Sequence, residues 1–182
     1  MSTDPLGQAL LVIARNAIGA RFGREASAFT PQPELGQPGA TFVTLTQNGQ
    51  LRGCIGSLEP YRTLAVDVAE NALAAAFRDP RFAPLASDEL ARTRIEVSLL
   101  AAAQAIDFVD EDDAIAQLRP GIDGLILSHG SRRATFLPQV WETLPDAHRF
   151  IAQLKLKAGL PGDFWDQDIS LARYEVKKWK EA

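Results

Sequence analysis

The sequence contains a single cysteine, Cys54, so a scaffold held together by internal disulfides is excluded. It contains only two histidines, His129 and His148, and neither lies in a close-spaced pair of the kind that structural zinc sites use. We therefore expect no metal site. A nucleophilic cysteine is normally activated by a base, and neither the spacing nor the local motif of either histidine supports a pair with Cys54.

An excess of basic residues is also absent, because the formal net charge is −4 and the only basic doublets are Arg132-Arg133 and Lys177-Lys178. This pattern argues against a nucleic-acid partner. No apolar run approaches the roughly 20 residues that cross a bilayer, and residues 1–5 carry no positive charge ahead of an apolar core. We therefore expect a soluble cytoplasmic protein that does not bind membranes.

What the sequence does have is enough apolar content for a packed core, 46% of 182 residues. We expect one domain over residues 1–182, with a two-lobed organisation as the alternative.

One stretch, Leu51-Arg52-Gly53-Cys54-Ile55-Gly56, places the cysteine between two glycines. An alternating run at 41–46 precedes it, and Asn48-Gly49 between the two runs predicts a hairpin with Cys54 on the return strand. Counting outward from this turn pairs Cys54 with Val43 and puts Arg52 on the same face, about 7 Å along the strand. The Arg52 guanidinium would then favour the thiolate.

Gly53 and Gly56 remove side chains from beside the sulfur, which predicts a bulge or the close approach of another backbone or a ligand. The alternative is that Cys54 is a small buried residue and the glycines only permit a bend.

Periodicity predicts the remaining elements. A hairpin, a proline and a helix follow one another at 41–78 and again at 124–158, with further helices at 5–23 and 110–118 and further strands at 95–99 and 169–176. This predicts an α+β fold in which two hairpin-plus-helix repeats pool their strands into one curved, barrel-like mixed sheet flanked by helices.

The helix predicted at 146–158 should bury Phe150 and Leu154, which lie one turn apart. Lys155 is expected on its exposed side, so that Lys155→Ala should cost little stability.

Three charged residues have two readings each. Glu96 alternates with the apolar residues Ile95 and Val97, so it points either to solvent or into a polar cleft. Asp79 and Arg81 either tie a turn together or line the same cleft.

The hexapeptide around Cys54 resembles the signature of the AMMECR domain family, whose bacterial and archaeal members belong to the AmmeMemoRadiSam system. Further similarity follows in the same order, over about residues 42–165. Its segments are Asp79-Pro80-Arg81-Phe82, Ile95-Glu96-Val97-Ser98, Gly124-Leu125, Leu137-Pro138-Gln139-Val140 and Lys157-Ala158-Gly159-Leu160. Residues Leu99 to Ala103 depart from the pattern, because they replace a proline-containing turn.

The resemblance implies two repeats that contribute to a single barrel-like sheet, and a site around Cys54. It implies catalytic roles for Cys54, Arg52 and Glu96. The substrate-binding residues that it implies are Gly53, Gly56, Asp79, Arg81 and Gln139. It names no cofactor.

The resemblance implies no established activity. We expect a function in a redox or modification pathway, on a small substrate or a partner protein, through a cleft around Cys54. The alternative is a non-catalytic binding or scaffold module. The partners implied are a Memo-type dioxygenase-like protein and a radical-SAM protein.

Overall fold

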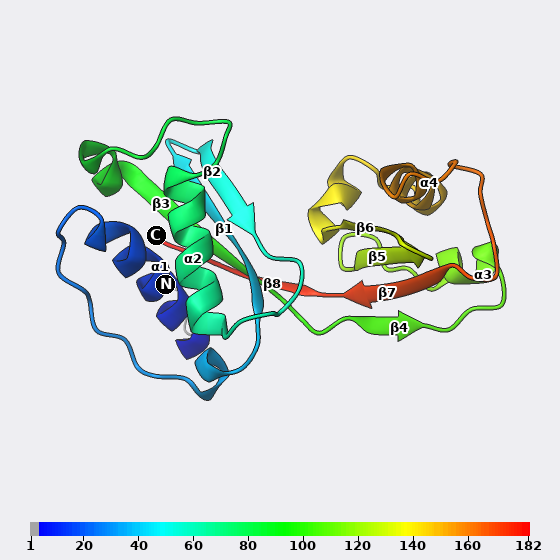
Figure 1. The fold of residues 1–182 in the computed structure, drawn as a ribbon, viewed down its shortest axis with the longest axis horizontal. Coiled ribbons are helices and arrows are strands. Elements are labelled where there is room, and N and C mark those ends of the chain that lie inside the picture. Colours follow the sequence, from blue (N-terminus) through cyan, green and yellow to red (C-terminus); the bar gives the residue numbers. More distant parts are fainter. Residues whose placement is uncertain (1–3) are drawn as a thin grey trace. The chain divides into compact units, whose positions relative to one another are not determined.

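The computed structural model describes residues 4–182, which form two compact units (Figure 1). Unit 1 comprises the described residues up to Leu100 together with Lys177–Ala182, and unit 2 comprises Ala101–Val176. Each unit has its own sheet and its own hydrophobic core.

The sheet of unit 1 has the strand order β2-β1-β3-β8. Its strands are β1 (Ala40–Gln47), β2 (Gln50–Gly56), β3 (Thr93–Leu100) and β8 (Val176–Lys180). β1 pairs antiparallel with both β2 and β3. β8 lies beyond β3, where the Glu181 N–H donates to the Ile95 carbonyl at 3.0 Å. β2 and β8 are therefore the edges of this sheet.

Two helices, α1 (Pro5–Ala20) and α2 (Leu64–Phe77), pack beside each other against the sheet of unit 1 (Figure 1). Asp4 caps α1 by accepting from the Leu6 N–H at 3.0 Å, and Pro5 occupies the first turn. The strand residues that face the helices are fully buried: Val43, Leu45, Ile95 and Val97. Short 3₁₀ helices lie at Pro33–Gly36 (η1) and Ser87–Arg92 (η2).

The sheet of unit 2 has the order β4-β7-β5-β6. Its strands are β4 (Gln104–Ile106), β5 (Gly124–His129), β6 (Arg132–Phe136) and β7 (Ser170–Tyr174). Its helices are α3 (Glu111–Ala116), the 3₁₀ helix η3 (Pro138–Glu142) and α4 (Ala147–Lys157). Phe150 of α4 is fully buried, and its ring stacks on Trp141 of η3 with the centroids 3.7 Å apart.

The α+β class is confirmed, but the prediction of one barrel-like mixed sheet is wrong, because residues 4–182 form two separate four-stranded antiparallel sheets. The reason lies in the strands outside the two hairpins. β1 of the first hairpin pairs with β3, whereas β5 of the second pairs with β7. The two hairpins therefore pair with different strands, and no strand forms backbone hydrogen bonds to both.

α4 confirms the predicted burial of Phe150 and Leu154, and Asp146 caps it. The expectation for Lys155 is wrong, because this residue is only 1% exposed. Its ammonium group donates to Glu111 and to the Gly162 carbonyl, and lies 5.3 Å from the centre of the Trp165 ring. A helical wheel cannot show this, because the partners come from outside the helix.

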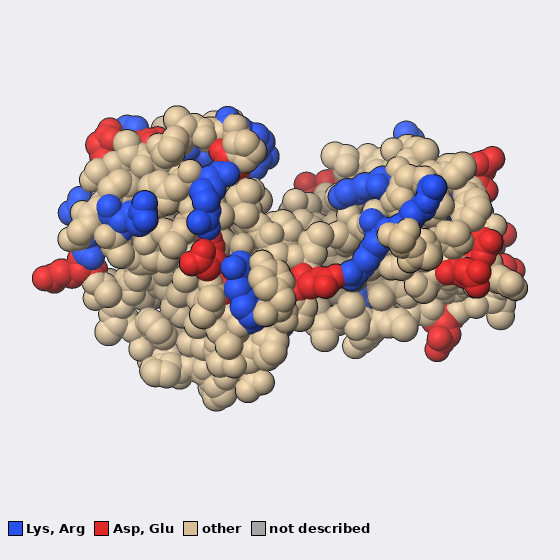
Figure 2. All heavy atoms as spheres, viewed as in Figure 1, with Lys and Arg blue, Asp and Glu red and all other residues tan. Residues whose placement is uncertain are grey.

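Acidic residues outnumber basic ones in unit 2, whereas the two kinds are nearly balanced in unit 1. Figure 2 shows acidic side chains gathered where α3 lies in unit 2. The first turn of α3 carries Glu111, Asp112 and Asp113, an arrangement that the helix dipole favours. Within residues 4–182, no helix combines the length and the apolar character needed to cross a membrane.

Candidate functional site

The strand that carries Cys54 contains a bulge. Thr46 pairs with Leu51, but the next pair is Leu45 with Gly53, so Arg52 has no partner on β1 and the register shifts. Cys54 therefore lies opposite Thr44, and the predicted pairing with Val43 is wrong by one residue. The predicted turn itself is confirmed, since Asn48 and Gly49 both have positive φ and Gln47 pairs with Gln50.

Gly53 brings β2 close to α2. A Cβ atom at this position would lie 2.1 Å from the carbonyl oxygen of Ala75, so only glycine fits here without movement. This confirms the expected close approach of another backbone. At Gly56 a Cβ would instead collide with the ring of Phe42, at 2.2 Å. Because Gly53 faces the helix, its neighbour Cys54 points to the opposite side of the sheet.

We call the side of the unit 1 sheet opposite α1 and α2 the outer face. Three side chains form a row across it, one from each of three adjacent strands: Cys54, Thr44 and Glu96. The Sγ atom of Cys54 lies 3.3 Å from Oγ1 of Thr44 in a hydrogen bond, and Thr44 is directly opposite Glu96. All three side chains are half-buried. The row thus places a thiol, a hydroxyl and a carboxylate side by side.

The backbone of Cys54 lies on the open edge of the sheet and is held there by an ion pair. Its N–H donates to Oδ2 of Asp79 at 2.9 Å, and its carbonyl accepts from Nη2 of Arg81 at 3.3 Å. Arg81 in turn donates to both oxygens of Asp79, at 3.0 and 2.7 Å. The two side chains thereby satisfy the edge groups that a further strand would otherwise bind.

The contacts between Asp79 and Arg81 shift the pKa values of both residues. Hydrogen bonds from the Arg81 guanidinium, and then from the Cys54 N–H, hold the pKa of the buried Asp79 carboxyl well below its usual range. The pKa of Arg81 is raised, chiefly by the hydrogen bond to Asp79 and also by the charge of that carboxylate.

Arg52, predicted to tune Cys54, is engaged elsewhere. Its Nε and Nη2 atoms donate to the two carboxylate oxygens of Glu89, at 3.0 and 2.9 Å. These bonds lower the pKa of Glu89 to about 2, with help from the Ala86 N–H. The ring of Phe82 is near both arginines, with its centroid 5.9 Å from Cζ of Arg52 and 5.5 Å from Cζ of Arg81. The effect of Arg52 on the thiol stays a prediction.

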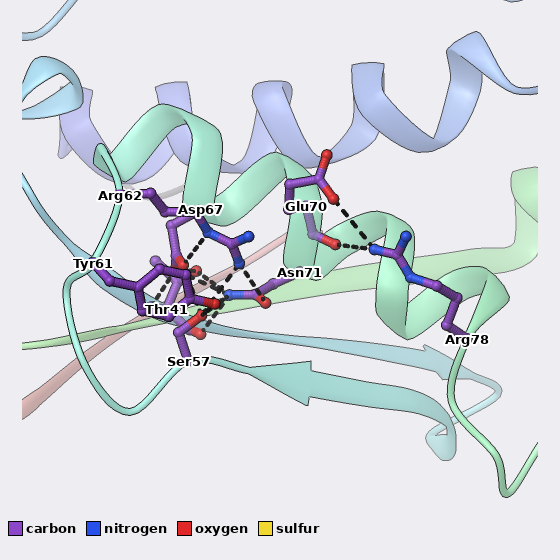
Figure 3. Close-up of polar contacts among 8 residues, drawn as sticks. All are labelled: Thr41, Ser57, Tyr61, Arg62, Asp67, Glu70, Asn71 and Arg78. Carbon is purple, nitrogen blue, oxygen red and sulfur yellow. Dashed lines mark hydrogen bonds and ion pairs between the residues drawn. The ribbon is translucent and has the colours of Figure 1, made fainter.

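A second polar cluster lies on the helix side of the sheet (Figure 3). Asp67 of α2 is fully buried, and its carboxylate accepts from Thr41, Ser57, Arg62 and Asn71. The Oγ atom of Ser57 donates its hydrogen to Asp67 at 2.7 Å, so this hydroxyl serves the cluster and is not placed as a nucleophile. The buried charge of Asp67 is thus paired with Arg62 and accepts hydrogen bonds on both carboxylate oxygens. We interpret the cluster as an anchor for the loop at 57–63 and for the start of α2.

The family model for AMMECR1 matches residues 11–179 of this chain. The chain belongs to the AMMECR1 family. A protein of Methanothermobacter thermautotrophicus is 37% identical to it over 180 residues, which cover 96% of this chain and 94% of that protein. A protein of Methanosarcina barkeri is 34% identical over 188 residues, covering 100% of this chain and 93% of the other.

One solved structure is similar to this chain in both fold and sequence over nearly the whole length of the chain. The crystal structure of an uncharacterized protein from Pyrococcus horikoshii aligns with a TM-score of 0.81 at 32% sequence identity, covering 98% of this chain and 93% of that one. The region matched to AMMECR1 contains every candidate residue named above.

The remaining candidates of this AMMECR1-family chain lie in unit 2. Gln139 is exposed in η3. His129 lies at the end of β5, where its Nε2 is 3.8 Å from Oδ1 of Asp166 and its ring meets Phe164 edge-on. Across residues 4–182, no three His, Cys, Asp or Glu side chains converge in a way that would hold a metal ion.

Sequence reasoning missed Thr44 and the cluster around Asp67. A signal for the cluster was present. Asp67 and Asn71 interrupt an otherwise apolar helix stripe with polar side chains four residues apart, which predicts a buried polar contact. Thr44 offered no signal, because its role depends on the bulge.

Proposed function

We propose that this protein acts on a small substrate or a partner protein in a redox or modification pathway, through the thiol of Cys54. The observation that carries this proposal is the outer-face row, in which a half-buried thiol contacts the Thr44 hydroxyl at 3.3 Å beside the Glu96 carboxylate. A cysteine that served only as core would be expected among the fully buried residues, on the helix side of the sheet.

Each neighbour has a physical role in this proposal. The Thr44 hydroxyl donates to the sulfur when the thiol loses its proton, and so stabilises the thiolate. The Arg81 guanidinium donates to the Cys54 carbonyl at 3.3 Å, which places a cation beside the residue that carries the thiol. Asp79 and Arg81 fix both backbone polar groups of Cys54, and thereby the direction of its side chain. Cys54 serves as nucleophile or as ligand contact.

Alkylation of the folded protein tests this proposal. Because Cys54 is the only cysteine, uptake of iodoacetamide can be followed by intact mass without interference. We expect labelling to be much faster than global unfolding, and Arg81→Ala to slow it at neutral pH. Arg52→Ala serves as the comparison for the cation that sequence analysis favoured. Labelling that merely tracked unfolding in all three proteins would refute a reactive site.

The second candidate function is a binding module that works with Memo-type and radical-SAM proteins. The loop at 57–63 favours it, because Leu58 and Tyr61 are 48% and 71% exposed although Ser57 and Arg62 anchor the loop to Asp67. A rigid loop with exposed apolar side chains loses little entropy on docking.

Native mass spectrometry of freshly purified protein, with and without these partners, separates the two functions. A retained small molecule that is lost in Cys54→Ser supports the enzyme. A clean apo mass with tight partner binding, weakened in Tyr61→Ala, supports the module.

A further inference from the structure

We infer that unit 1 binds a small molecule carrying a phosphate group, in a pocket at the end of α1. The pocket is open to solvent and has a volume of about 580 Å³. Small-molecule sites typically enclose about 300–1,000 Å³. The inference does not depend on the thiol, because none of Cys54, Thr44 and Glu96 lines this pocket.

The walls of the pocket come from five parts of unit 1. They are the last turns of α1, the chain at 24–27, η2, the start of β3 and the residues that follow β8. Figure 1 shows the C-terminal end of the chain beside α1. Because these segments are far apart in the sequence, the pocket exists only when unit 1 is folded.

Hydrogen bonds hold the walls in place. The Arg15 guanidinium is paired with Glu181 and also donates to the backbone carbonyls of η2 and β3, at 3.0 and 2.8 Å. The Asn16 side chain donates to the Ser27 carbonyl at 2.8 Å and accepts from the Ser27 N–H at 2.9 Å. A pocket that is already formed loses little conformational entropy when a ligand binds.

Two arginines that line the pocket have no carboxylate partner within residues 4–182. Of the other three arginines of unit 1 beyond the paired ones, Arg21 lies over the ring of Phe77, whereas Arg24 and Arg94 both line the pocket. The Arg24 guanidinium has no hydrogen bond within the described part of the chain, and Arg94 donates only to the Ala91 carbonyl, at 3.4 Å. Six of the nine arginines of unit 1 bind a carboxylate: Arg15, Arg52, Arg62, Arg78, Arg81 and Arg92.

The charges around the pocket favour an anion with more than one negative charge. Glu181 is paired with Arg15, so Glu25 is the one acidic side chain of the lining that has no ion pair among the described residues. Two guanidinium forks can bind the three free oxygens of a phosphate group, whereas a carboxylate offers only two oxygens. A phosphate monoester carries about 1.5 to 2 negative charges at neutral pH, enough to outweigh the repulsion by Glu25.

The size of the pocket indicates more than a bare phosphate ion. The remaining wall includes the side chains of Leu90 and Ala91, which provide apolar contact for the body of the ligand. A small phosphate ester therefore fits both the charge and the volume.

Titration calorimetry of the full chain tests this with three probes of similar shape, which are phenyl phosphate, benzoate and phenol. At low ionic strength we expect phenyl phosphate to bind saturably, with a dissociation constant on the order of 1 mM. Benzoate should bind more weakly, and phenol should give no saturable heat. In wild-type protein, the amide shifts that phenyl phosphate perturbs should lie at residues 15–27 and 90–94.

Variants show whether the two arginines are responsible. Arg24→Gln and Arg94→Gln should each weaken phenyl phosphate binding roughly 3- to 10-fold. Arg92→Gln is the matched control. It changes the net charge equally and lies two residues from Arg94, but Arg92 is paired with Asp88 at 4.0 Å and does not line the pocket. Its affinity should stay close to that of wild type.

Three results would overturn the inference. Benzoate binding as tightly as phenyl phosphate would show that the pocket does not prefer a phosphate group. An equal loss of affinity in Arg92→Gln and Arg94→Gln would show only general attraction to surface charge. Amide shifts confined to residues outside the pocket would place the ligand elsewhere. None of these results changes the alkylation of Cys54, so the proposed function is tested separately.

Discussion

The hairpins β1–β2 and β5–β6 are built alike at their turns and differently along their strands. Each is closed by a two-residue loop whose first residue, Asn48 or Gly130, has positive φ. Pairing in β5–β6 then continues without interruption from His129 to Leu125. Pairing in β1–β2 is broken after two pairs by the bulge at Arg52.

The difference shows what the bulge does. It shifts the alternation of β2 so that Gly53 faces α2 and Cys54 faces outward beside Thr44. In the regular hairpin of unit 2, Leu125, Leu127 and Ala134 simply alternate into the core. The candidate site therefore lies at the irregular hairpin, as bulges next to functional sites commonly do.

The largest expected effect is a loss of stability in unit 2 that leaves unit 1 folded. Leu154→Ala removes a fully buried side chain from the core of unit 2 and should cost about 2–5 kcal/mol. Because the core of unit 1 shares none of these residues, amide exchange in residues 4–100 should remain slow in this variant. Loss of protection in both units together would show that the two cores unfold as one.

Lys155→Ala provides a neighbouring measurement in the same helix. It removes a buried cation from Glu111 and Trp165, and we expect a cost of about 2–3 kcal/mol by chemical denaturation. A cost within about 0.5 kcal/mol, typical of a surface position, would contradict the contacts described for this side chain.

Glycine substitutions compare the hairpins directly. Gly53→Ala forces a Cβ against the Ala75 carbonyl and should destabilise the protein by about 3 kcal/mol. Gly130→Ala meets no atom within 4 Å, so only its positive φ is strained, at about 1–2 kcal/mol. Thermal unfolding of the two variants measures the difference. Equal costs would mean that β2 can move away from α2 easily.

The ion pair between Arg52 and Glu89 makes the stability of the β1–β2 hairpin dependent on pH. The pKa of Glu89 is lowered to about 2 from 4.5, so its contribution is fully present above pH 4.5 and is lost as the pH falls toward 2. Allowing for partial exposure, we expect about 2 kcal/mol. Denaturation of wild type and Glu89→Gln at pH 7 and pH 3 checks this, because the variant should show the smaller loss on acidification.

The smallest effect concerns Asp79 and Arg81, which bind the backbone of Cys54. Asp79→Asn disturbs the carboxylate that binds the Cys54 N–H, and should change the alkylation rate of the folded protein a few-fold. Asp123→Asn is the matched control, because Asp123 is also fully buried and bound by an arginine, but lies in unit 2. Equal changes in both variants would indicate general loosening of the protein, and not positioning of the thiol.

The first hairpin could be predicted because its turn signal is local, and the helices because their apolar periodicity and caps are local. The exact position of the bulge, and with it the partner of Cys54, could not, since Gly53 meets Ala75 across 22 positions of sequence. The same holds for Lys155, whose partner Glu111 precedes it by 44 positions. Contacts of this range are decided by packing and leave no pattern in a short window.

The short strands β4 and β8 were missed for a different reason. β8 reads Val-Lys-Lys-Trp-Lys, and lysines are what natural proteins place on edge strands to prevent aggregation. That composition hides the strand signal. β8 is the strand that brings the end of the chain back to the sheet of the first hairpin. Because it was not predicted, the strands of the two hairpins were assigned to one sheet.

The position of β8 bears on how the protein is made. Trp179 packs against Gly7 of the first helix, and Glu181 binds both Arg15 and the Ile95 N–H. A chain emerging from the ribosome exposes the outer edge of β3 throughout the synthesis of residues 101–176, and closes it only when β8 appears. The strand edge beside Glu96 is thus the last to be covered during translation, and the first half of the chain must stay soluble until then.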